Sequence, residues 1–132
     1  MRRLVAAAAG MDARALVAAL PELLPQFAQP DIEWIEDPSR LDAQVHRGYD
    51  GVLASWTRWL EQWSEYDFEL ESVSDCGDDV LMVARETARG ATGGVPVSSR
   101  IFVVLTMRDG KVARWREFYE EADARAAAGI GT

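Results

Sequence analysis

The chain has 132 residues, of which 48% are hydrophobic, and carries a formal net charge of −8 at pH 7. This length is typical of one domain, and because such a chain buries roughly two thirds of its extended-chain surface on folding, we expect a single core spanning residues 1–132. The acidic charge argues against nucleic-acid binding, which requires a basic surface that neutralises phosphates.

The first part of the chain is expected to be helical. Residues 1–20 form one or two alanine-rich amphipathic segments, with a candidate break at Gly10 and an end at Pro21, because proline lacks the N–H that a helix interior requires. The basic start and short apolar run resemble a secretion signal, but Asp12 and Arg14 interrupt that run. No apolar run reaches the ~20 residues of a membrane-spanning helix. Cys76 is the only cysteine, so the chain has no disulfide framework, and we expect a cytoplasmic protein.

A strand and a second helix are expected next. Residues 31–36 alternate between polar and apolar side chains, as in a half-buried strand, and Pro38 ends the pattern. After a loop over residues 39–49, Asp50 is the expected N-cap of a helix over residues 51–64. The apolar side chains of this helix recur every three or four residues and form one broad stripe. They are Val52, Trp56, Trp59, Leu60 and Trp63.

The second half of the chain changes to the two-residue period of strands. The expected strands span residues 67–74, 79–89, 95–107 and 111–119. Short turns join them, with Asp109-Gly110 as the strongest hairpin signal, so the strands should form an antiparallel meander. A short helix over residues 121–128 follows. Helices followed by an antiparallel sheet predict an α+β fold in which the helices cover one face of the sheet.

The last predicted strand places a carboxylate between two aromatic rings. Trp115, Glu117 and Tyr119 share one face, since side chains alternate along a strand. Burying an acid on an apolar face is costly unless the acid is paired or protonated. Glu117 is therefore the leading candidate for a catalytic residue.

Four short segments stand out in this order of elements. They are Trp34 to Pro38, Arg47-Gly48, Asp109 to Val112 and Trp115 to Tyr119. Together with the element order they resemble the SnoaL-like branch of the nuclear transport factor 2-like superfamily, and the resemblance covers nearly the whole chain. It implies a cone-shaped fold, in which a strongly bent antiparallel sheet wraps around a pocket covered by the N-terminal helices. The superfamily includes ketosteroid isomerase, polyketide cyclases and limonene-epoxide hydrolase, so the fold alone does not select a reaction.

Two acids acquire candidate roles from this resemblance. Asp37 lies in a Glu-Asp-Pro segment similar to the one that carries the general base of ketosteroid isomerase, so it is an alternative proton acceptor. The competing interpretation is a turn-forming acid before a proline. The segment that ends at Glu117 resembles the Trp-Arg-Asp segment of limonene-epoxide hydrolase, whose aspartate activates water.

Arg85 is the expected partner of Glu117. The hydrolase has an Arg-x-Asp element on an earlier strand, and the comparable residues here keep the arginine but place Thr87 at the second acid. If Arg85 meets Glu117, the arginine keeps the glutamate ionised and ready to orient water, an enol or a phenol. The alternative is a structural salt bridge in the cavity wall. Glu86 should point to the opposite face.

Aromatic side chains are expected to line the pocket and to bind a flat, apolar ligand. They are Trp34, Trp56, Trp59, Trp63, Trp115 and Tyr119. The alternative for the tryptophans of the helix is an ordinary place in the core. His46, the only histidine, lies in the predicted loop and is either a proton shuttle or a solvated side chain.

The leading hypothesis is a homodimeric pocket protein that acts on a small hydrophobic or aromatic oxygenated molecule by acid–base chemistry of the cyclase, isomerase or hydratase type. Apolar residues on both faces of residues 101–105 indicate a covered outer face, as in a sheet-to-sheet dimer. One cysteine and one histidine cannot form a zinc site by themselves, and this chemistry needs no metal or organic cofactor. The alternatives are a non-catalytic binding or dimerisation module and a structural dimer whose cavity is filled by tryptophan.

Overall fold

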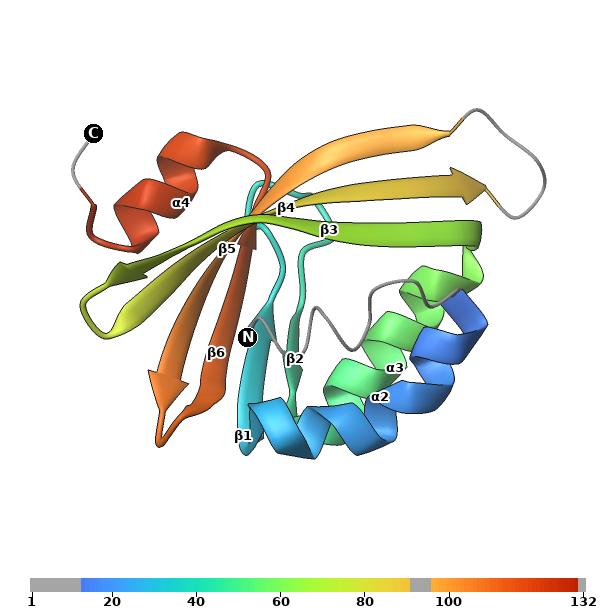
Figure 1. Ribbon diagram of the computed structural model, residues 1–132, viewed down its shortest axis with the longest axis horizontal. Helices are drawn as coiled ribbons and strands as arrows, with labels where there is room; N and C mark the ends of the chain where they lie inside the picture. Colours follow the sequence, from blue (N-terminus) through green and yellow to red (C-terminus); the bar gives the residue numbers. More distant parts are fainter. Residues whose placement is uncertain (1–12, 91–95, 131–132) are drawn as a thin grey trace.

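A curved sheet of six strands dominates the computed structural model, which describes residues 13–90 and 96–130 (Figure 1). The elements in chain order are α2 (Ala13–Phe27), β1 (Ala28–Ile35), β2 (Val45–Arg47), α3 (Gly48–Glu61), β3 (Trp63–Cys76), β4 (Asp79–Gly90), β5 (Val97–Arg108), β6 (Lys111–Phe118) and α4 (Glu121–Ala127). No helix in this part of the chain is long and apolar enough to cross a membrane. The predicted break at Gly10 and the predicted strand start at residue 95 lie outside the described residues.

The strands lie side by side in the order β2-β1-β6-β5-β4-β3. Strands β3 to β6 form the predicted antiparallel meander. The sheet as a whole is mixed, because β1 is antiparallel to β2 but parallel to β6. In the turn between β5 and β6, Asp109 and Gly110 both have positive φ (53° and 77°), the backbone that a tight hairpin turn requires. The α+β class and the bent sheet that the sequence predicts are confirmed.

Pro21 does not end the first described helix, contrary to the prediction. Helix α2 continues through Pro21 and Pro25 to Phe27. Each proline removes a backbone N–H, but Leu20 and Leu24 are each only 6% exposed and pack into the core from the same helix. Burial of the apolar face therefore outweighs the local cost of the prolines.

Helix α3 begins earlier than predicted, at Gly48, and ends at Glu61. Asp50 lies in its first turn, where the helix dipole favours a negative charge, and the N-cap is Arg47, which makes no side-chain cap hydrogen bond. Trp63 is the first residue of β3 instead of part of the helix. The predicted Asp50 cap is wrong because the short strand β2 leads directly into the helix and leaves no loop between them.

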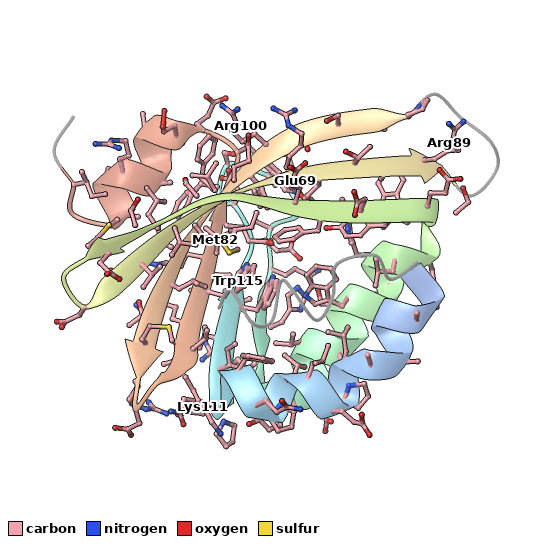
Figure 2. All side chains as sticks on the ribbon, in the orientation of Figure 1. Glu69, Met82, Arg89, Arg100, Lys111 and Trp115 are labelled. Atoms are coloured by element: carbon pink, nitrogen blue, oxygen red, sulfur yellow. The ribbon has the colours of Figure 1, made fainter. Side chains whose placement is uncertain are left out.

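Apolar side chains on the inner face of the sheet form the largest part of the core. Met82, Val103 and Trp115 pack there with Leu24 of α2 and Val52 of α3. Figure 2 shows Met82 and Trp115 pointing into the space between the sheet and these two helices. This face also carries the candidate site.

Helix α4 covers the outer face at one end of the sheet, on the side opposite α2 and α3 (Figure 1). Phe102 and Val104 of β5 pack there with the fully buried Ala124. Elsewhere the outer face is polar, and Arg100 Nε lies 2.8 Å from Glu71 Oε1. Helix α4 of the same chain thus covers apolar residues of β5 that indicated a covered outer face.

Candidate functional site

A cavity of about 200 Å³ lies between α3 and the inner face of the sheet, beside the loop that follows β1. This volume is below the range of roughly 300–1,000 Å³ that is usual for drug-sized ligands, so the cavity suits a small molecule. Its wall combines aromatic, acidic and basic side chains. They are Trp34, Trp56, Trp59 and Tyr119, then Glu36, Asp42, Glu86 and Glu117, and finally Arg40 and Arg58.

Stacked indole rings build one side of the cavity. Trp34 and Trp115 are register partners on the parallel strands β1 and β6, and their rings stack with centroids 4.0 Å apart and planes at 12°. Trp56 of α3 meets Trp34 edge-on, at 5.5 Å and 84°. Trp34 and Trp56 therefore form this side of the cavity wall, and Trp115 stacks on Trp34 without lining the cavity.

Four of the six predicted ligand-contacting aromatics line the cavity, namely Trp34, Trp56, Trp59 and Tyr119. The other two lie outside its lining. Trp115 is only 6% exposed and belongs to the core, and Trp63 packs against Trp59 with ring centroids 5.5 Å apart. The wall is also more strongly charged than the predicted apolar pocket.

Glu117 faces the cavity from β6, on the same side as Trp115. Burial raises the pKa of Glu117 to about 7, and the negative charges of Glu86 and Glu36 add to this effect. The indole N–H groups of Trp115 and Trp34 oppose it. The N–H of Trp115 points close enough to lower the pKa of Glu117 but does not meet the criteria of a hydrogen bond, since its buried Nε1 has no partner within the described residues. None of the ion pairs that the described residues form involves Glu117.

The predicted pair of Arg85 and Glu117 does not form. Arg85 Nη1 donates to Ser98 Oγ at 3.3 Å, away from the cavity, whereas Glu86 lines the cavity beside Glu117. The inner face of β4 carries Met82 and Ala84, and the even-numbered Glu86 continues that series. The prediction was wrong by one position, and a one-residue offset on a strand exchanges its two faces.

Glu86 is held by Tyr66 of β3, whose hydroxyl donates a hydrogen bond to Glu86 Oε2. Burial raises the pKa of Glu86, and the hydrogen bond from Tyr66 offsets part of that rise. Burial and the charge of Glu86 in turn raise the pKa of Tyr66 well above its ordinary value. The tyrosine therefore stays a hydrogen-bond donor to the carboxylate at neutral pH.

Asp37 is 2% exposed and lies outside the lining of the cavity. Its Oδ1 accepts the backbone N–H of Ser39 at 2.8 Å, and its Oδ2 accepts the backbone N–H of Tyr119 at 2.7 Å. Burial raises the pKa of Asp37, but these hydrogen bonds outweigh burial and the net pKa is lowered. The carboxylate thus ties the loop after β1 to the end of β6, next to Glu117.

His46 is a buried residue of β2, 7% exposed, and not part of a solvated loop. Its Nε2 lies 2.8 Å from Glu36 Oε2, within hydrogen-bonding distance. Arg40 Nη1 lies 3.6 Å from the other oxygen, Glu36 Oε1. Glu36 lines the cavity, so His46 touches the site through this carboxylate. Arg40 also lies close to Tyr119 and offsets part of the rise that burial causes in the tyrosine pKa.

Sequence reasoning missed Glu36, Glu86 and Arg40 as cavity residues. Glu36 could have been found, because it lies two residues after Trp34 and should share the face of Trp34 if the strand pattern continues past β1. Arg40 lies in a loop, whose side-chain directions no period predicts. Among the side chains that the structure describes, no group of three or more His, Cys, Asp or Glu is placed to hold a metal ion.

The model of the SnoaL-like domain family matches residues 1–115, so the chain belongs to this family. A search of curated proteins found no match. The resemblance inferred from the sequence is confirmed, and the small-molecule pocket is the property that this fold family shares.

Solved structures share the fold over most of the chain. A protein of ketosteroid isomerase-like fold from Catenulispora acidiphila DSM 44928, in complex with trimethylamine, is 15% identical with a TM-score of 0.66, covering 89% of this chain and 92% of that one. An NTF2-like protein from Burkholderia thailandensis E264 is 25% identical with a TM-score of 0.66, covering 92% and 99%. A protein assigned as a SnoaL-like polyketide cyclase from Jannaschia sp. CCS1 is 19% identical with a TM-score of 0.64, covering 84% and 79%.

Proposed function

We propose that the protein uses this cavity for acid–base chemistry on a small, mainly hydrophobic molecule that carries an oxygen function, in a reaction of the cyclase, isomerase or hydratase type. One observation carries the proposal: the carboxyl of Glu117 faces the cavity with a pKa of about 7. A group that is half ionised at neutral pH can both accept and return a proton, which is the condition that favours general acid–base catalysis.

In this proposal Glu117 is the catalytic residue that takes a proton from the substrate and returns it. Glu86 and Glu36 act through their charges, which keep the proton affinity of Glu117 high. Arg40 and Tyr119 lie at the cavity wall as donors for a substrate oxygen that gains negative charge. Arg85, the predicted electrostatic partner of Glu117, has no role in this assignment because it lies outside the cavity lining.

Asp37 and His46 take positioning roles in the same proposal. Asp37 fixes the backbone that follows Glu117, and His46 orients Glu36. Neither side chain lines the cavity. The proposal therefore keeps Glu117 as the single base.

The solved neighbours support a ligand pocket without selecting the ligand. One is assigned as a polyketide cyclase, and another is a complex with trimethylamine. A cyclase substrate and a small amine differ in size and charge, so the ligand of this chain has to be argued from its own side chains.

A non-catalytic binding module is the second candidate. It is favoured by the two ion pairs of Arg40, which lies 3.6 Å from Glu36 Oε1 and 3.4 Å from Asp42 Oδ1 and is not free to approach a substrate oxygen alone.

A homodimer in the cytoplasm remains our expectation for either candidate. The polar part of the outer face, beyond α4, is the surface that such a dimer would use.

The test is Glu117→Gln, which keeps the shape of the side chain and removes its proton transfer. We expect turnover of aromatic ketones, polyketide-like phenols or epoxides to fall by roughly 10²–10⁴-fold. Tryptophan fluorescence should still show saturable quenching by neutral compounds of these classes, and the circular dichroism spectrum should be unchanged. Glu22→Gln, at an exposed position of α2, is the matched control. Wild-type turnover in Glu117→Gln would overturn the assignment.

A further inference from the structure

Acidic groups outnumber basic ones in the cavity wall, and the basic ones leave part of the acid unpaired. Four carboxylates line the cavity together with two guanidinium groups. Arg40 lies against Glu36 and Asp42, at the rim. None of the ion pairs that the described residues form involves Glu86 or Glu117. Glu86 and Glu117 therefore face the cavity outside any ion pair, although Arg58 lies in the same wall.

The same wall is rich in aromatic rings. Trp34 and Trp56 stand nearly at right angles, with centroids 5.5 Å apart, and Trp59 and Tyr119 complete the aromatic lining. Because these four aromatic side chains line the cavity, a ligand bound there contacts their rings. Cations are attracted to the faces of aromatic rings, and tryptophan attracts them most strongly.

We propose that the cavity selects a small organic cation, whose ammonium group carries apolar substituents, as its substrate or ligand. This inference rests on the proposed function, because it names the ligand class for the same cavity. The positive charge would lie between the tryptophans and the carboxylates of Glu86 and Glu117, while the substituents contact the rings. A neutral molecule of the same shape would leave the repulsion between the carboxylates unrelieved.

The cation should couple its binding to the ionisation of Glu117. The titratable and charged groups that line the cavity with Glu117, or that interact with it electrostatically, come from every neighbouring element. They are Glu36 after β1, Arg40 and Asp42 in the following loop, Arg58 on α3, Tyr66 on β3, Glu86 on β4 and Tyr119 after β6. A positive charge added among them favours the ionised carboxylate, so a cation binds more tightly as pH rises through about 7, the pKa of Glu117.

The experiment compares choline with its neutral isostere 3,3-dimethylbutan-1-ol on the full chain, by calorimetry and tryptophan fluorescence. Choline carries a permanent charge, so its own protonation cannot change with pH. We expect saturable choline binding at pH 8 and an affinity for the isostere that is lower by about tenfold or more. Choline affinity should rise about tenfold between pH 6 and pH 8, and the affinity of the isostere should stay constant.

Variants connect the effect to the carboxylate of Glu117. Glu117→Gln should abolish the pH dependence of choline affinity, whereas Glu22→Gln on the exposed face of α2 should retain it. Equal affinity for choline and the isostere in the wild-type protein, or no saturable response to choline, would overturn the inference. If the protein turned over a neutral ketone and choline did not compete, the inference of a cationic ligand would be overturned, but the proposed acid–base function would still hold. Choline binding without turnover of any probe would support the inference and count against catalysis.

Discussion

The direction of individual side chains decides which acids meet in the cavity. Glu117 could be placed correctly from the sequence, because the alternation around Trp115 distinguishes the two faces of β6. The same reasoning fails on β4, where Leu81 and Met82 are both buried, one on each face. A strand that is apolar on both sides gives no signal for its inner face. The resemblance to an Arg-x-Asp element then selected the wrong face for Arg85.

Asp37 offers a test at the same scale. Asp37→Asn replaces one acceptor oxygen by an NH₂ group, which leaves the backbone N–H of Ser39 or Tyr119 buried without a partner. We expect a loss of about 2 kcal/mol in the free energy of unfolding, measured in urea at pH 7. Asp67→Asn, at an exposed position of β3, should change it by less than about 0.5 kcal/mol. Equal losses in the two variants would refute the role of Asp37 as a clamp.

Helices and strands follow local signals only where burial does not compete. The Asp109-Gly110 turn agrees with its prediction, because its positive φ values are a local requirement that few residues meet. Helix α2 continues through its two prolines, because the burial of Leu20 and Leu24 stabilises it. This burial is a tertiary effect that cannot be predicted from the local sequence. Strand β2 has three residues, too few for a periodic pattern, and it was predicted as part of a loop.

Helix α4 provides the prediction at the scale of elements. Ala124 is 0% exposed beneath the outer face of the sheet, so Ala124→Asp would bury a larger, charged side chain in a cluster of apolar residues. We expect the free energy of unfolding to fall by about 3 kcal/mol or more, in urea unfolding followed by circular dichroism. Ala122→Asp places the same charge at an exposed position of the same helix and should be nearly neutral. A loss in Ala124→Asp no larger than in Ala122→Asp would contradict the packing of α4 on β5.

The proton affinity of Glu117 is a property of the whole molecule. Glu36 follows β1, Glu86 belongs to β4 and Glu117 to β6, and only the curved sheet brings the three carboxyl groups near one cavity. The family resemblance could predict that a pocket forms, because the element order covers nearly the whole chain. It could not predict the charge of that pocket, because a shared fold does not fix the side chains that line it.

The most direct test of this account is the titration of the Glu117 carboxyl by ¹³C NMR, in the folded protein and in urea. The resonance is assigned by its absence in Glu117→Gln. The account predicts a midpoint of about 7 in the folded state and a value near the ordinary 4.5 when the chain is unfolded and the other carboxylates are dispersed. A midpoint near 4.5 in the folded protein would contradict the central claim, because Glu117 would then be an ordinary solvated acid.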